Sequence, residues 1–322
     1  MTFSFRPAER SDVNLLIGIV GGTGGGKSFS AMRLASGIAQ GKPFAVIDTE
    51  NGRARHYADM FKFDACDLKA PFSPDRYTEA IVAADEAGYP VIVIDSMSHS
   101  WAGDGGVLDM QEAEFERMGS KESAKMASWI KPKKAHKQMV SQLLQVRAHV
   151  IMCFRAEPKI EMIKENGKTV VVPKSTLTGL DGWVPVCDKN LPFELTLSAL
   201  LMADKPGAPH WIKLQEQHKA IFAQGELIDE LAGERLLSWA KGGGFKPTIV
   251  DQLKSINPRQ EEQQETSAIR LDELELLLIE AKAEDLKETW ADIVGICRRA
   301  KDQNAYGYLE RVKDRRKKEL GL

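Results

Sequence analysis

The sequence predicts an α/β fold in which a mostly parallel sheet is flanked by helices. Short apolar runs rich in valine and isoleucine recur along the chain, and such runs are typical of strands buried on both faces of a parallel sheet. Segments with helical periodicity lie between them, and this alternation indicates strands joined by right-handed crossover helices. We expect strands within residues 14–20, 44–50, 90–96, 149–154 and 193–203, and helices within residues 28–39, 75–88 and 136–148.

Beyond residue 155 the pattern changes and predicts β-hairpin additions to this core. Residues 159–173 form two alternating runs that meet at Asn166 and Gly167, a pair that favours a hairpin turn. A second hairpin is expected around residues 203–211.

The chain is expected to form a core, a linker and a small C-terminal module. Residues 1–240 carry the α/β pattern, and residues 241–266 lose apolar periodicity, as a linker does. Residues 267–322 regain a helical pattern and predict a module of short helices. Its apolar face comprises Leu286, Trp290, Ile293, Val294 and Cys297, and Leu309 and Val312 continue it.

Composition and charge exclude several classes of protein. The formal net charge of -2 gives no global attraction for nucleic acid or an anionic membrane, so such binding depends on local patches. Cysteines 66, 153, 187 and 297 form no CxxC pair, which argues against a zinc site and a disulfide framework. No apolar run approaches the ~18 residues of a membrane span, and the first residues do not resemble a signal peptide. We therefore expect a cytoplasmic protein without membrane contact.

A glycine-rich loop between the first strand and the first helix matches the pattern G-x-x-x-x-G-K-[ST]. Its glycines allow backbone N–H groups to surround a β-phosphate, and the following helix directs its positive end there. Lys27 is expected to reach the β- and γ-phosphates and the Ser28 hydroxyl to bind Mg²⁺, so the loop predicts binding of ATP with Mg²⁺. Contacts with the nucleotide are expected from Gly21, Gly22, Thr23, Gly24, Gly25, Gly26, Lys27, Ser28 and Phe29.

Asp95 is the second expected metal-side residue. It lies at the carboxyl end of a wholly apolar strand, and ligands of open α/β sheets bind at that edge. Asp95 is thereby placed to hold Mg²⁺ together with Ser28. The alternative is an acidic residue that merely caps a buried strand.

Glu50 is the candidate for orienting the attacking water. Many helicases and AAA+ motors carry a catalytic glutamate directly after the metal-binding aspartate, but Ser96 follows Asp95 here. Asp48 and Glu50 lie on one face of their strand, and Glu50 is nearest its end. We expect Glu50 to position the water. In the alternative, it only begins a turn.

In this order, the glycine loop, VIDTE (46–50), VIVIDS (91–96) and HVIMCFR (149–155) resemble the RecA-like core of P-loop NTPases. More closely, they resemble short phage-encoded RecA-like ATPases with an AAA-type domain, which are linked to phage recombination and single-strand annealing. The resemblance covers residues 14–225. It implies a homo-oligomer that assembles on single-stranded DNA in the host cytoplasm, with ATP between subunits.

The resemblance also suggests roles for further residues. Arg155 stands where RecA-like proteins more often have a glutamine that senses the γ-phosphate, although a surface arginine is the alternative. With Lys27, Glu50 and Asp95 it completes the expected catalytic set. His218 and Lys219 lie nearest to the position of lysines that reach a neighbouring subunit's ATP.

Two basic segments fall where the resemblance places DNA-facing loops. Residues 121–137 contain six lysines and one glutamate, and residues 156–180 occupy the place of the second loop. Solvated surface is the alternative for both. Phe115 and Trp129 either stack on bases or pack in the core. The lysines of the second loop are Lys159, Lys164, Lys168 and Lys174.

The C-terminal segment 298–321 carries nine basic and four acidic residues. It is expected to dock a single-strand-binding or annealing protein, or to tether DNA.

Together these features predict an ATPase that acts on single-stranded DNA in recombination, annealing or repair. Two other readings stay open: an assembly factor without DNA contact, and a small-molecule kinase. A kinase needs an arginine-rich lid, and residues 51–57 (NGRARHY) supply the only arginine pair near the expected ATP edge.

Overall fold

The computed structural model describes residues 7–8, 10, 13–165, 168–173, 182–222 and 226–243, together with individual positions between 278 and 320. The chain divides into two compact units, Met1–Pro247 and Thr248–Leu322, which are described separately.

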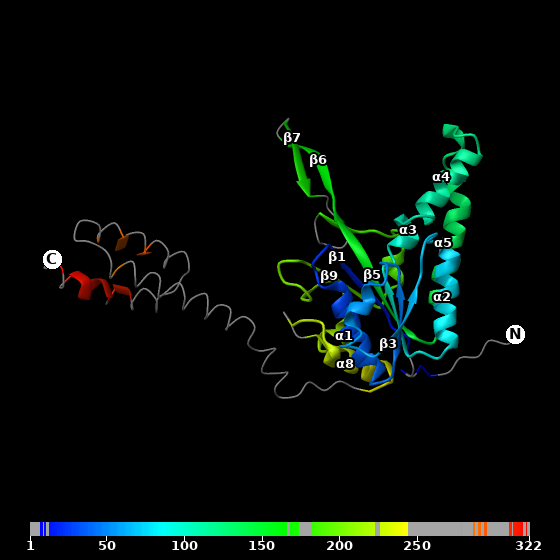
Figure 1. The fold of residues 1–322 in the computed structure, drawn as a ribbon. Coiled ribbons are helices and arrows are strands. Elements are labelled where there is room, and N and C mark those ends of the chain that lie inside the picture. Colours follow the sequence, from blue (N-terminus) through cyan, green and yellow to red (C-terminus); the bar gives the residue numbers. More distant parts are fainter. Residues whose placement is uncertain are drawn as a thin grey trace. The chain divides into compact units, whose positions relative to one another are not determined.

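A mostly parallel sheet forms the centre of the first unit (Figure 1). The five strands predicted from apolar runs are confirmed as β1 (Leu16–Gly21), β2 (Phe44–Asp48), β4 (Val91–Asp95), β5 (His149–Pro158) and β9 (Leu197–Leu201). The strand order is β10-β9-β1-β5-β4-β2-β3, so β5 separates the strand of the glycine loop from the strand of Asp95. The carboxyl ends of the parallel strands therefore meet at one edge.

The remaining strands are additions to this parallel core. β10 (Pro209–Lys213) pairs antiparallel with β9, as the second predicted hairpin requires. β6 (Ile160–Glu165) and β7 (Lys168–Pro173) form the first predicted hairpin, whose Asn166–Gly167 turn lies outside the described residues. Two strands were not predicted, namely β3 (Phe63–Asp67) beside β2 and the short β8 (Trp183–Pro185) beside the end of β5.

Helices cover both faces of the sheet (Figure 1). On one face, α1 (Lys27–Ala39) and α8 (Glu230–Ala240) share a buried cluster with the side chains of Ile17, Ile19 and Val93. On the other, α2 (Pro74–Glu86) and α5 (Ile130–Leu143) share one with Leu16, Ile92 and Ile94. Alternate residues of each strand thus enter opposite cores, which explains why the strand sequences are apolar throughout.

Shorter helical segments connect these layers. They are η1 (Arg53–Tyr57), α3 (His99–Ala102), α4 (Val107–Arg117), η2 (Glu122–Ala124), η3 (Ala127–Trp129), α6 (Leu191–Glu194) and α7 (Glu216–Lys219). We call residues 107–137, which comprise α4, η2, η3 and the start of α5, the arm. The arm and the β6–β7 hairpin both project beyond the carboxyl edge of the sheet (Figure 1).

Close contact between α1 and α8 depends on glycine. A Cβ atom on Gly37 would lie 1.9 Å from the carbonyl oxygen of Glu230, and one on Gly233 would lie 2.4 Å from that of Leu34. Arg33 on α1 adds an ion pair with Glu230 at 2.6 Å, and the Asp229 carboxylate caps α8 by accepting the N–H of Ala232 at 2.8 Å. This contact fixes the helix that directly follows the glycine loop.

The second unit has a helical apolar cluster of its own. Leu278, Leu286, Ile293, Leu309 and Val312 are buried together, and Trp290 packs against them. These positions include most of the predicted apolar face, whereas Cys297 lies outside the described residues. The predicted linker also lies outside them beyond residue 243, so its bounds stay a prediction. In the described part of the chain, no helix combines the length and apolarity needed to cross a membrane.

Candidate functional site

A cavity of about 550 Å³ opens at the carboxyl edge of the sheet, within the size range of small-molecule sites. It brings together the glycine loop, the residue Glu50 beyond β2, the carboxyl-terminal parts of β4 and β5, the first residues of α1 and both ends of η1. Its lining consists of Gly21, Gly22, Thr23, Gly24, Gly26, Lys27, Ser28, Phe29, Glu50, Arg53, Tyr57, Asp95, Arg155, Ala156 and Glu157.

Gly25 differs from the other predicted loop residues because it does not line the cavity. A Cβ atom there would lie 2.5 Å from the carbonyl oxygen of Leu201 at the end of β9. The absence of a side chain at Gly25 therefore lets the loop rest on the neighbouring strand.

The helix α1 begins at Lys27, so its first N–H groups face the cavity. The Lys27 ammonium donates to the carbonyl oxygen of Gly22 at 2.8 Å, within the loop itself. A positive side chain and a helix N-terminus at one point provide the electrostatic environment that a phosphate group prefers.

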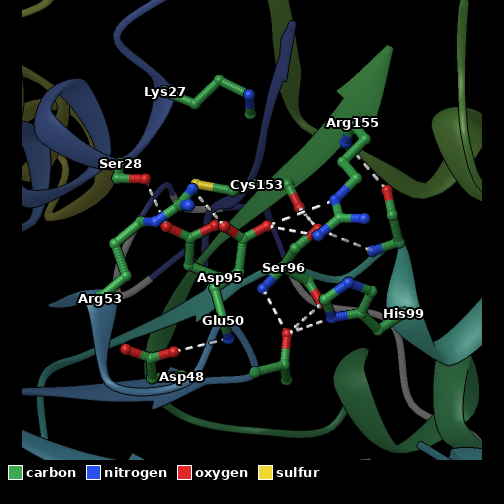
Figure 2. A network of polar contacts seen from close by, with 12 residues as sticks. Lys27, Ser28, Asp48, Glu50, Arg53, Asp95, Ser96, His99, Cys153 and Arg155 are labelled. Atoms are coloured by element: carbon green, nitrogen blue, oxygen red, sulfur yellow. Dashed lines mark hydrogen bonds and ion pairs between the residues drawn. The ribbon is translucent and has the colours of Figure 1, made fainter. Parts of the chain in front are cut away.

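Ser28 and Asp95 meet on the sheet side of the cavity (Figure 2). The Ser28 hydroxyl donates to an Asp95 carboxylate oxygen at 2.5 Å. Burial raises the pKa of Asp95, and the Ser28 hydrogen bond and the Lys27 charge only partly offset it. A buried carboxylate with a raised pKa gains from a nearby cation.

These two oxygen donors fit Mg²⁺. In phosphate-binding sites this ion takes one or two protein oxygens and completes its shell with phosphate oxygens and water. Among the described residues no cluster of three or more His, Cys, Asp or Glu side chains forms a metal site by itself. The donor set therefore suits a metal that arrives with a nucleotide.

Glu50 is held between two arginines from different elements (Figure 2). One of its carboxylate oxygens accepts from Arg155 on β5 at 2.8 Å, and the other accepts from Arg53 on η1 at 2.6 Å. Burial raises the pKa of Glu50, but the hydrogen bond and charge of Arg155, with the charges of Arg53 and His99, outweigh it and lower the pKa overall. The carboxylate is therefore ionised at neutral pH.

Asp48 is the last residue of β2, so Glu50 lies beyond the strand and does not share a strand face with Asp48 as predicted. Asp48 fixes the turn that follows. Its two carboxylate oxygens accept the backbone N–H groups of Glu50 and Ala54, each at 2.7 Å. Asn51 and Gly52 between them have φ values of 60° and 80°. The buried Asp48 thus folds the chain back so that η1 starts beside Glu50.

Thr49 ties the ends of β2 and β4 together behind this carboxylate. Its hydroxyl accepts the backbone N–H of Ser96 at 2.8 Å and lies 2.7 Å from Nδ1 of His99. His99 also stacks on Phe72, with ring centroids 4.9 Å apart, and burial lowers its pKa. The Tyr77 hydroxyl donates to the Ser96 carbonyl at 2.8 Å. The segment after Asp95 is held by hydrogen bonds to neighbouring elements.

Several other predicted residues lie away from the cavity. His218 is fully buried against Trp239, with ring centroids 4.3 Å apart, so its side chain does not reach the surface. Lys219 is exposed and pairs with Glu216 at 2.7 Å. Of the two, only Lys219 presents its charge at the surface.

The basic segments lie on the arm and the hairpin. All six lysines of residues 121–137 are exposed, and so are Lys159 and Lys164. Phe115 and Trp129 are half-buried. The Trp129 ring stacks on that of Trp101, with ring centroids 6.2 Å apart. The side chains of Lys168 and Lys174 lie outside the described residues.

Four residues that line the cavity were not predicted from the sequence, namely Arg53, Tyr57, Ala156 and Glu157. The arginine pair of residues 51–57 was a visible signal, but the pattern did not show which arginine faces the cavity. That direction depends on the turn that Asp48 holds.

A family model described as an AAA domain matches residues 14–184, which is more than half of the chain. The matched range contains every residue that lines the cavity. A search of curated proteins finds no match.

Proposed function

Because the chain belongs to the AAA-domain family, we propose that it binds and hydrolyses ATP with Mg²⁺ and couples this to binding of single-stranded DNA. One observation carries the ATPase part: the glycine loop, the Ser28–Asp95 pair and the ionised Glu50 converge on one cavity. These are the parts that phosphoryl transfer needs, namely a phosphate cradle, a metal-side carboxylate and a group that orients water.

In the proposed mechanism, the loop and Lys27 bind the β- and γ-phosphates, while Ser28 and Asp95 face the metal. When bound, Mg²⁺ neutralises part of the phosphate charge. Glu50 orients a water molecule and accepts its proton, which requires the ionised form that its arginine partners favour. Arg155 reaches the γ-phosphate from the end of β5.

The connection of both projections to the cavity supports coupling to DNA. β5 carries Arg155 in the cavity and leads directly into the β6–β7 hairpin. The backbone N–H of Arg155 donates to the Ser98 hydroxyl at 2.9 Å, and Ser98 immediately precedes α3, which leads to the arm. A shift of Arg155 toward a phosphate would therefore act on both projections.

The exposed lysines of the arm are the proposed contacts to phosphate groups of a single strand. The proposal includes a homo-oligomer with ATP at subunit interfaces and a role in recombination, annealing or repair in a phage-infected host cell. The C-terminal unit is proposed to dock a single-strand-binding or annealing protein.

ATP hydrolysis with and without single-stranded DNA across a salt series tests this function. We expect stimulation that fades as salt rises, and none in Lys27→Ala, which loses nucleotide binding. The constant K for binding of single-stranded DNA falls with salt, and each lysine that neutralises a phosphate makes the slope of log K against log salt steeper by about 0.7. The double variant Lys134→Ala, Lys137→Ala should therefore make that slope shallower by about 1.4. The matched control replaces the exposed Lys42 and Lys62, which lie at the amino ends of β2 and β3.

Other outcomes identify other functions. Hydrolysis without any DNA effect, and without DNA binding at low salt, would overturn the DNA part and favour an assembly factor. Transfer of phosphate to a small molecule instead of water would establish a kinase.

A further inference from the structure

We propose that Arg53 binds the terminal phosphate of ATP and shares its guanidinium between that phosphate and Glu50. This inference rests on the proposed function, because it assumes that the cavity holds a nucleoside triphosphate. Arg53 belongs neither to the glycine loop nor to the expected catalytic set, and its place follows only from the fold.

The turn after β2 decides where Arg53 lies. Asp48 accepts the N–H groups on both sides of the turn, and the two left-handed residues between reverse the chain. As a result, Arg53 is the first residue of η1 and its side chain returns over the strand end to meet Glu50 (Figure 2). Arg55, two residues later, pairs instead with Asp67 and does not line this cavity.

The two arginines use separate oxygens of Glu50, so both bonds exist together. The Glu50 side chain is only 14% exposed, whereas Arg53 is 65% exposed and Arg155 52% exposed. The glutamate is thus the fixed centre, and the guanidiniums reach it from the open side of the cavity. Arg53 engages Glu50 through one terminal nitrogen, and a guanidinium has five N–H donors in a planar fork. Donors on the same group can therefore serve a ligand in the cavity.

A triphosphate creates the need for this second cation. Glu50 and Asp95 both line the cavity, so the terminal phosphate would face two carboxyl groups. Repulsion between a phosphate and a carboxylate falls when a guanidinium bonds both, and arginine suits such bridging because its fork matches either group. Lys27 approaches the phosphates from the side of the glycine loop, and Arg155 approaches from β5. Arg53, on η1, supplies positive charge from a third side of the cavity.

The test compares ATP with ADP, because only ATP has the terminal phosphate. Equilibrium affinities for both nucleotides with Mg²⁺ would be measured for the wild type, Arg53→Ala, Arg53→Lys and the control Arg55→Ala. A charge-assisted hydrogen bond lost from the terminal phosphate should weaken ATP binding about 10- to 100-fold in Arg53→Ala and leave ADP binding unchanged. Arg53→Lys should restore part of the preference for ATP, and Arg55→Ala should keep all of it.

Equal weakening of ATP and ADP in Arg53→Ala, or no change in either, would overturn the inference. The unchanged ADP affinity also shows that the variant is folded. Absence of hydrolysis in the wild type would refute the proposed function, yet the ATP-to-ADP ratio would still test Arg53.

Discussion

The charge state of Glu50 is set by a competition between burial and its two arginine partners. Burial acts to raise its pKa, and the guanidiniums of Arg155 and Arg53 together prevail and lower it below the ordinary value of 4.5. For Asp95 burial prevails over the Ser28 hydrogen bond and the Lys27 charge, and its pKa is raised. The two carboxyl groups of one cavity are thus tuned in opposite directions, as groups with different roles often are.

Replacing Glu50 by glutamine should preserve ATP binding and slow hydrolysis. The amide keeps the size of the side chain but cannot accept a proton, and general base catalysis contributes about 10²- to 10⁴-fold. Single-turnover hydrolysis together with nucleotide affinity would check this. Unchanged turnover would remove Glu50 from the mechanism.

Arg155→Ala should move the acid limb of the hydrolysis profile to higher pH. In the wild type the lowered pKa keeps Glu50 ionised until the pH falls below 4.5. Without Arg155, the effect of burial is less opposed, so the pKa rises and the ionised form is lost at a higher pH. The measurement is kcat/KM as a function of pH, and Arg155→Lys should keep the limb nearer its original place. A limb that stays in place in both variants would contradict this account.

At the scale of elements, apolar runs predicted the buried strands well, because strands covered on both faces leave a continuous signal. β3 was missed because it lies at the sheet edge and is mostly exposed. α4 was missed because it belongs to the projecting arm and buries little apart from Val107 and Glu114. The cavity residues of the loop and strand ends followed from motifs, whereas Arg53 and Tyr57 required the three-dimensional turn.

Gly37→Ala should destabilise the first unit through the α1–α8 contact. Alanine improves helix propensity by ~1 kcal/mol, but its Cβ would lie 1.9 Å from the Glu230 carbonyl oxygen, so the helices must separate. Overpacking of this kind costs about 1–3 kcal/mol, and backbone cannot move aside as a side chain can. Urea unfolding would measure the loss, with the half-buried Ser36→Ala as the neutral control on the same helix. Equal stability of the two variants would show that α8 shifts at no cost.

At the scale of the whole molecule, the cavity belongs to one compact unit and the C-terminal apolar cluster belongs to the other. Every described residue that lines the cavity lies within the first unit, Met1–Pro247. A chain ending at residue 247 should therefore bind ATP with the affinity of the full chain. Calorimetric titration of both chains would measure this, and a large loss of affinity would show that residues 248–322 support the cavity.

The common direction of the strands also has a practical consequence. Since the cavity, the arm and the hairpin all lie toward the carboxyl edge, the turns at the amino edge are remote from all three. Lys42, before β2, and Ala87, after α2, are exposed there. A fluorophore attached at either position alone, and not at the exposed native Cys66, would report tumbling and assembly without entering the reaction it is used to observe.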